Sequence, residues 1–256
     1  MHKDAGAYGE LAPYQKTARG YPVPLHQWST AMLVRLNSGP QKLNEGHLAA
    51  LAGDRIMCSD FQYPRLAEIF GEGEPAEYVY QVTSGAVRTY KLLADGRRQI
   101  NAFHLPGDIF GIENGEVYRF SADAIQNTTV GVARRLSLFG GFTQRESGFT
   151  TNLLGLVTRN LQHAEDHMLL LGRKTAVERV ATFLLEMDER IGSPSVMILP
   201  MNRRDIADYL GLTLETVSRA LAVLRKRSLI RVTGGNLRVL VLVDRGALAK
   251  LDQMDL

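Results

Sequence analysis

Residues 202–231 read NRRDIADYLGLTLETVSRALAVLRKRSLIR, and this stretch decides the fold of the C-terminal part of the chain. Asn202 can cap a first helix, because Asp205 follows three residues later at the spacing of a capping box. Gly211 can end that helix, since glycine tolerates the left-handed backbone of a helix C-terminus. Thr213 then offers a hydroxyl cap to a second helix. Two short helices around a glycine turn predict a helix-turn-helix.

The second helix carries polar side chains on one face. Its apolar positions recur at helical spacing and are expected to face inward: Val217, Leu221 and Leu224. Glu215, Ser218 and Arg219 share the opposite face near the helix start, where base edges are read. Arg219 can donate twice to guanine, whereas Glu215 can only accept, which suits the amino group of cytosine. These three residues are the candidate base readers; the alternative is a surface ion pair between Glu215 and Arg219.

The residues around these helices complete a winged form of the motif. Four are candidates for contact with the DNA backbone: Arg203, Arg204, Thr213 and Thr216. The following run VTGGNLRVLVL, residues 232–242, holds two β-prone segments separated by Gly234, Gly235 and Asn236. This pattern is typical of a short hairpin, and a hairpin after a helix-turn-helix forms a wing.

The region upstream changes pattern twice. Residues 1–28 are polar and aperiodic, which favours a loosely held extension. Residues 43–56, LNEGHLAALAGDRI, are expected to form a short amphipathic helix. From Phe61 to Phe139, short β-prone runs are broken by frequent glycines, which indicates a small antiparallel barrel or roll.

Residues 149–172 switch to helical periodicity and carry an apolar seam. Its members are spaced 3, 4, 3, 4 and 3 apart: Leu154, Val157, Leu161, Ala164, Met168 and Leu171. This spacing favours a coiled coil between two copies, since operators with two half-sites need two reading heads. The alternative is a helix packed only on its own β-roll. Residues 175–190 supply another amphipathic helix that opens the DNA-binding domain.

Composition agrees with a folded protein that binds nucleic acid. At 256 residues, with 45% hydrophobic content, the chain can fill one large or two ordinary cores. Residues 173–256 hold 14 Lys and Arg against 10 Asp and Glu, whereas residues 1–172 hold 16 against 17. The basic surplus therefore lies with the helix-turn-helix, where phosphate contacts are needed. No apolar run reaches the ~18 residues of a membrane span and no signal-peptide core is present, so a cytoplasmic protein without membrane contact is expected.

Two stretches carry a family resemblance. The run DIADYLGLTLETVSRAL, with its E-x-x-S-R arrangement, resembles the DNA-binding end of the CRP/FNR transcription regulators, closest to the FNR and FixK branch. The run YVYQVTSGAVRTYKLLADGRRQINAFHLPGDIFG, residues 78–111, resembles the β-roll sensor domain of that family. With the intervening helix, the resemblance covers residues 45–242, and the E-x-x-S-R helix is its more specific part.

The resemblance implies an α+β fold with four parts. These are an N-terminal extension over residues 1–28, a cyclic-nucleotide-binding-like β-roll over 29–147, a dimerisation helix over 148–173 and a winged helix-turn-helix over 174–256. It further implies a homodimeric regulator of double-stranded DNA, in the role of an activator that recruits RNA polymerase. The implied operator is an inverted repeat similar to TTGAT-N4-ATCAA.

The residues specify no signal to which such a regulator would respond. An FNR-type iron–sulfur cluster needs four thiolates, and Cys58 is the only cysteine. The phosphate cassette of the family, Gly-Glu followed by Arg-Ser or Arg-Thr, has an extra residue in both Gly111-Ile112-Glu113 and Arg119-Phe120-Ser121-Ala122. No cofactor or metal is therefore expected. Regulation by a cyclic nucleotide or another small ligand, and redox regulation through Cys58, remain as alternatives.

The histidines and the search for catalytic motifs point to no further chemistry. His163 and His167 stand four residues apart, a spacing that suits a metal, but they are interpreted as two exposed helix residues. The sequence contains no G-x-x-x-x-G-K and no H-E-x-x-H motif, and no nucleophile–histidine arrangement in a plausible context. An enzyme is therefore not expected.

Overall fold

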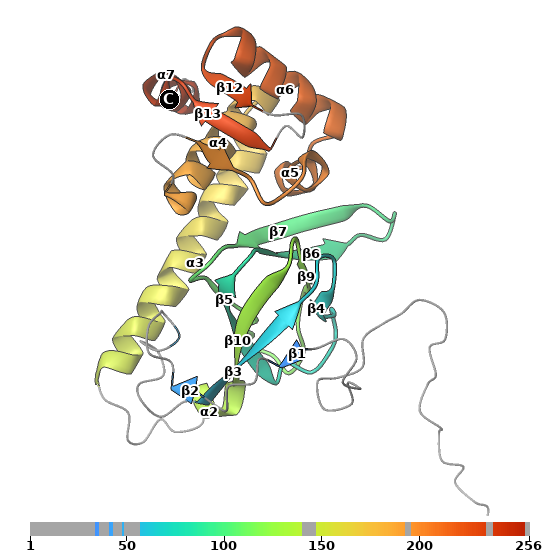
Figure 1. Ribbon diagram of the computed structural model, residues 1–256, viewed down its shortest axis with the longest axis vertical. Helices are drawn as coiled ribbons and strands as arrows, with labels where there is room; N and C mark the ends of the chain where they lie inside the picture. Colours follow the sequence, from blue (N-terminus) through green and yellow to red (C-terminus); the bar gives the residue numbers. More distant parts are fainter. Residues whose placement is uncertain are drawn as a thin grey trace, which may run out of the picture.

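A computed structural model describes residues 34–35, 41–42, 48, 57–139, 147–192, 196–233 and 238–253. The chain forms a β-roll, a long helix and a C-terminal domain of helices around a small sheet, which confirms the expected α+β fold (Figure 1). The expected N-terminal extension lies outside the described residues, as does the expected helix over residues 43–56 apart from Leu48.

The β-roll is built from two antiparallel sheets. The larger has the order β1-β3-β10-β5-β8, with β2 also paired to β3; its strands are β1 (Val34–Arg35), β2 (Gln41–Lys42), β3 (Met57–Tyr63), β5 (Tyr78–Ser84), β8 (Ile109–Phe110) and β10 (Thr128–Arg134). The smaller has the order β4-β9-β6-β7, with strands β4 (Glu68–Phe70), β6 (Val87–Leu92), β7 (Arg98–His104) and β9 (Ser121–Ala124). Helix α2 (Arg135–Phe139) follows the last strand.

Aromatic side chains from both sheets pack together inside the roll. Phe70 stacks on Tyr118 with ring centroids 3.8 Å apart, and Tyr80 stacks on Phe110 at 5.2 Å. All four side chains are at most 3% exposed. Burying an aromatic side chain of this size contributes about 1.5–3 kcal/mol, so this stack is a main source of stability for the roll.

A glycine turn passes the chain from one sheet to the other between β5 and β6. Gly85 has a φ of +91°, and a Cβ there would lie 2.6 Å from the Asn127 carbonyl oxygen. A side chain at this position would therefore be strained twice, by its backbone and by its neighbour.

Helix α3 (Ser147–Arg173) connects the roll to the C-terminal domain (Figure 1). Leu156 packs in a cluster with Val79 and Ile109 of the roll, whereas Leu170 packs in the core of the C-terminal domain. The predicted helix over residues 149–172 is confirmed, and its inner face joins both domains.

In the part of the C-terminal domain that the structure describes, helices pack around a three-stranded antiparallel sheet of order β11-β13-β12. Its elements are α4 (Ala176–Ile191), β11 (Met197–Ile198), α5 (Arg203–Leu210), α6 (Leu214–Lys226), β12 (Ile230–Thr233), β13 (Val239–Leu242) and α7 (Arg245–Gln253). The predicted hairpin is confirmed by the pairing of β12 with β13, while its turn, Gly234 to Asn236, lies outside the described residues.

The predicted caps of α5 and α6 are present. The Asn202 side chain accepts from the Asp205 amide at 2.9 Å, and the Asn202 amide donates to the Asp205 carboxylate at 3.3 Å. Gly211 follows α5 with a left-handed φ of 62°. The Thr213 hydroxyl accepts from the Thr216 amide at 3.2 Å and caps α6. These local bonds fix the angle between the two helices, because they order the residues at both ends of the turn.

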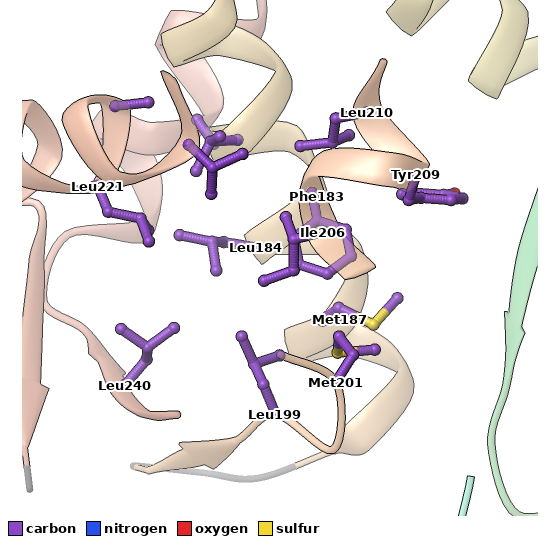
Figure 2. Close-up of a cluster of buried hydrophobic side chains, with 14 of the residues drawn as sticks. Phe183, Leu184, Met187, Leu199, Met201, Ile206, Tyr209, Leu210, Leu221 and Leu240 are labelled. Carbon is purple, nitrogen blue, oxygen red and sulfur yellow. The ribbon is translucent and has the colours of Figure 1, made fainter. Parts of the chain in front are cut away.

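The core of this domain lies between α4, α5, α6 and the sheet (Figure 2). Phe183 and Leu184 of α4 point toward Ile206 of α5, Leu221 of α6 and Leu240 of β13, and each is at most 5% exposed. Within the part of the chain that the structure describes, no helix is long and apolar enough to cross a membrane.

Candidate DNA-binding surface

The three candidate base readers lie together on the outer face of α6. Glu215 and Arg219 are exposed and Ser218 is half-buried, whereas Val217 and Leu221 on the inner face are 0% and 5% exposed. The apolar face of α6 therefore attaches the helix to the core, and its polar face is left available to a partner.

Glu215 is held as a carboxylate. The α6 backbone amide of its own residue and the Thr213 hydroxyl lower its pKa, and nearby Arg204 and Arg219 lower it further. The side chain thus remains an acceptor without a proton at neutral pH, which is the state that can accept from a cytosine amino group.

The candidate backbone residues lie at the start of α5 and α6. Arg204 is exposed in the first turn of α5, but the neighbouring Arg203 is half-buried and its Nη1 donates to Ser218 Oγ at 3.2 Å. Thr213 and Thr216 also contact each other, with their hydroxyl oxygens 3.0 Å apart at the start of α6. Sequence reasoning found these positions but not the bond between Arg203 and Ser218.

The other side of α5 is fixed to the roll by buried ion pairs. Asp205, 1% exposed, accepts from Arg88 Nη1 at 2.7 Å and from Arg98 Nη2 at 2.6 Å. Arg98 also donates to Asp208 through its Nε at 2.9 Å, and Arg88 donates to Asp123 at 2.8 Å. One carboxylate therefore caps α5 and at the same time receives two arginines from strands β6 and β7.

A second set of contacts joins α4 to the roll. Arg190 Nη2 donates to the Phe103 carbonyl at 2.7 Å and to Asp108 at 2.6 Å, and its Nη1 donates to Glu186 at 3.0 Å. Burial disfavours the charged guanidinium, but Asp108 and Glu186 outweigh that cost and raise the pKa of Arg190. The Phe103 ring packs 5.1 Å from that of Tyr209, so apolar contact accompanies the ion pairs.

Sequence reasoning did not identify Arg88, Arg98 or Arg190 as positioning residues. Their bonds to Asp205 and Asp108 join residues 82 to 117 positions apart, and no local spacing announces such pairs. Asp205 itself was recognised only as a helix cap. The one available signal was the placement of two arginines, Arg88 and Arg98, within β-prone segments.

The interpretation of His163 and His167 as exposed residues was wrong. His163 Nε2 lies 3.1 Å from Glu186 Oε1, and the His167 ring stacks on Tyr209 at 4.2 Å. Burial and the neighbouring His163 lower the pKa of His167 to about 4, so it is neutral at physiological pH. Both histidines pack at the junction of α3 with α4 and α5, because the inner face of α3 is wider than its seam predicts. Within the described ranges, no group of three or more His, Cys, Asp or Glu is placed to hold a metal ion.

The predicted seam lies on the outside of α3. Four of its side chains are exposed hydrophobics: Leu154 at 64%, Val157 at 48%, Leu161 at 56% and Met168 at 66%. Ala164 is exposed as well, and Leu171 is half-buried. The packing of the helix on its own chain therefore uses other residues, among them Leu156 and Leu170, and leaves the seam uncovered in a single chain.

Two possible effector sites have clear local environments. Burial and the charge of Asp60 raise the pKa of Cys58 to about 12, which keeps the thiol protonated and weakly nucleophilic. Redox chemistry at Cys58 therefore has little chemical basis. At the second site, Arg119 of the segment that resembles the phosphate cassette donates from Nε to Glu113 Oε2 at 2.8 Å.

Comparisons with known proteins agree with this geometry. Residues 178–251 match the model of the Crp-like helix-turn-helix domain, and residues 61–141 match that of the cyclic nucleotide-binding domain. The nitrogen fixation regulation protein FixK of Azorhizobium caulinodans is 40% identical over 253 residues, which cover 97% of this chain and 98% of that protein. The transcriptional activatory protein AadR of Rhodopseudomonas palustris is 41% identical over 204 residues, 75% of this chain and 85% of that protein. The structure of FixK2 from Bradyrhizobium japonicum, 55% identical, superposes with a TM-score of 0.71 over 76% of this chain and 97% of that one.

Proposed function

Because the chain belongs to the CRP/FNR family of transcription regulators, in its FixK-like branch, we propose that it binds an inverted-repeat operator as a homodimer and activates transcription there. It is a DNA-binding transcription regulator. The observation that carries the finer proposal is the polar outer face of α6, where Glu215, Ser218 and Arg219 lie together on a capped and well-packed helix.

Each residue of that face has a role that fits its chemistry. Arg219 donates twice to guanine, Glu215 accepts from cytosine, and Ser218 contacts the base beside them. Arg203, Arg204, Thr213 and Thr216 contact phosphates at the edges of the groove. The expected operator is similar to TTGAT-N4-ATCAA, in which each half-site holds one G·C pair for Arg219 and Glu215.

The exposed seam of α3 supports the homodimer. Four large apolar side chains in helical register would be costly to leave in water, and an identical helix can cover them. A dimer in which the two α3 helices pair along their seams places two α6 helices on one face of the DNA, as an inverted repeat requires.

We place the protein in the cytoplasm, with RNA polymerase as its partner and without enzymatic activity. The divisions at residues 28, 147 and 173 separate extension, sensor-like roll, dimerisation helix and DNA-binding domain. The pairing of Arg119 with Glu113 supports operator binding without cyclic AMP, because the guanidinium that resembles the phosphate ligand of the family already has a carboxylate partner.

Gel retardation with two synthetic duplexes tests this function. The first carries TTGAT-N4-ATCAA, and the second has the same half-sites with five more base pairs between them, about half a helical turn. Binding to the first duplex without added cyclic AMP is expected, with loss of the complex as salt rises to a few hundred millimolar. The second duplex presents its half-sites on opposite faces and should bind far more weakly. Equal binding to both would refute the homodimeric inverted-repeat model.

A further inference from the structure

The bond between Arg203 and Ser218 links the first helix of the motif to the recognition helix. Arg203 is the first residue of α5 and follows the capping residue Asn202, so its backbone is fixed. Its Nη1 donates to Ser218 Oγ at 3.2 Å across the turn between the helices. Ser218 is half-buried at this contact and lies on the same face of α6 as Glu215 and Arg219.

The direction of this hydrogen bond restricts what the serine can do. A serine hydroxyl has one hydrogen to donate and two lone pairs to accept with, whereas a guanidinium can only donate. The bond therefore uses a lone pair of Ser218, and the positive charge of Arg203 repels the hydroxyl hydrogen. The hydrogen is directed away from α5, and Ser218 meets a partner on the outer side of α6 as a donor.

The surroundings of Arg203 differ from those of the arginines that hold the roll. Among the described residues no carboxylate forms an ion pair with it, and its Nε is enclosed without a hydrogen-bond partner. Burial and the nearby charge of Arg225 lower its pKa. Holding a partly desolvated cation in this place costs stability, because no carboxylate of the described ranges compensates its charge. A role within the fold alone does not account for that cost, whereas a role in binding does.

We propose that Arg203 is a positioning residue for base recognition, which fixes the Ser218 hydroxyl as a donor so that Ser218 selects a base with an acceptor in the major groove. Thymine offers O4, and purines offer N7, but cytosine presents only its amino donor there. Cytosine can be met only through the second lone pair of Ser218, which leaves the hydroxyl hydrogen without an acceptor on that base, so cytosine is disfavoured at the base that Ser218 faces. This inference rests on the proposed contact of Ser218 with a base, and it goes beyond the phosphate contact proposed for Arg203.

The test compares two adjacent arginines of the same helical turn. Arg203→Met and Arg204→Met each remove one cation, so both should lose affinity for all sequences and reduce the salt slope by about one. Competition binding with every single-base operator variant then separates them. Arg203→Met should also reduce discrimination against cytosine at one position per half-site by about 3- to 10-fold, the worth of one hydrogen bond. Arg204→Met should leave that discrimination intact.

Further variants identify Ser218 as the group through which Arg203 acts. Ser218→Ala should lose discrimination at the same position, and the double variant Arg203→Met, Ser218→Ala should lose no more than either single one. Arg203→Lys restores the charge and a donor, and should recover part of the discrimination. The melting temperature of each variant checks that the helix-turn-helix is folded.

Three results would overturn the inference. If Arg203→Met weakens all operator variants by the same factor as Arg204→Met, Arg203 contacts phosphate only, while base reading by Ser218 stands. If the two substitutions add at the shared position, the residues act separately. If Ser218→Ala has no effect that depends on position, the proposed base contact fails, and the inference fails with it.

Discussion

The helix-turn-helix has two charged faces, which differ in burial: the ionised side chains are buried and paired on one face and exposed to solvent on the other. On the face toward the roll, Asp205 is 1% exposed and receives both Arg88 and Arg98. On the face carried by α6, Glu215 and Arg219 are exposed to solvent. Charged side chains therefore stabilise the fold where the chain itself supplies the partner ion, and they are available for recognition where DNA supplies it.

The physical reason lies in solvation. An ion taken out of water must be paired and hydrogen-bonded, or its desolvation cost is not recovered. An exposed ion keeps its water until a partner displaces it, and an exposed ion pair contributes little to folding. Removal of a charge should therefore lower the stability of the fold on one face and lower DNA affinity on the other.

The largest effect is expected from Asp205→Ala. This change leaves Arg88 and Arg98 with one acceptor fewer each and removes the carboxylate that accepts from the Asn202 amide in the capping box of α5, so the free energy of unfolding should fall by about 3–5 kcal/mol. Urea denaturation measures it. Asp208→Ala is the matched control: the Asp208 side chain is 21% exposed and, among the residues that the structure describes, forms an ion pair only with Arg98. Its cost should be about 1 kcal/mol. Equal costs for the two variants would contradict the role assigned to Asp205, in which one buried carboxylate joins α5 to both Arg88 and Arg98.

The same comparison extends to apolar residues of α3. Leu161 is 56% exposed on the seam, whereas Leu170 is 4% exposed in the core. Leu161→Asp should leave the monomer folded but place a charge against its symmetry mate, weakening association by about 3 kcal/mol. Leu170→Asp should instead destabilise the fold. Sedimentation and thermal melting distinguish the two results, and an undiminished dimer in Leu161→Asp would refute the seam.

Arg219→Ala should lower DNA affinity with little effect on the stability of the fold. Loss of a bidentate contact to guanine should cost about 1–3 kcal/mol of binding free energy per half-site. Because Arg219 is exposed, the free energy of unfolding should change by less than about 0.5 kcal/mol. Fluorescence anisotropy and urea denaturation measure the two quantities. A large loss of stability without loss of affinity would place Arg219 among the structural arginines.

Glu68 of β4 is a half-buried carboxylate whose two oxygens differ in their surroundings. Its Oε1 is enclosed without a hydrogen-bond partner in the described part of the chain, and burial, with Asp123 and Glu74, raises its pKa from 4.5 to about 7. The folded protein therefore binds the proton more tightly, and its stability should fall as pH rises from 4.5 to about 7. Glu68→Gln should remove that slope and stabilise the fold at pH 8 by ~1 kcal/mol, a small gain because the side chain is partly solvated. Melting curves at pH 5 and pH 8 are the measurement, and an unchanged slope would exclude Glu68 as its source.

Local patterns predicted the DNA-binding domain well. The caps at Asn202 and Thr213 and the left-handed Gly211 involve residues within a few positions of one another, so their spacing was enough to place both helices. The inward residues of α6 followed from helical periodicity for the same reason. The strands of the roll were visible as a group, through frequent glycines, but not in their order.

Contacts between distant segments were not predictable. The bonds of Arg88 and Arg98 to Asp205 depend on how the roll meets α5, which no sequence period encodes. The partial burial of His163 and His167 depends on α4 and α5, which cover part of α3 outside its seam. The bond from Arg203 to Ser218 spans 15 residues and appears only when the turn has brought both helices together.

Competition binding tests whether the outer face of α6 reads bases. It compares Arg219→Ala and Glu215→Ala on every single-base variant of the operator. Arg219→Ala should lose preference at the half-site guanine, and Glu215→Ala should lose preference at the cytosine that it faces. Glu215→Ala should lose specificity more than total affinity, because it also removes a negative charge from beside the phosphates. If both variants weaken every operator variant by one uniform factor, these residues do not read bases, and the assignment of α6 as recognition helix is wrong.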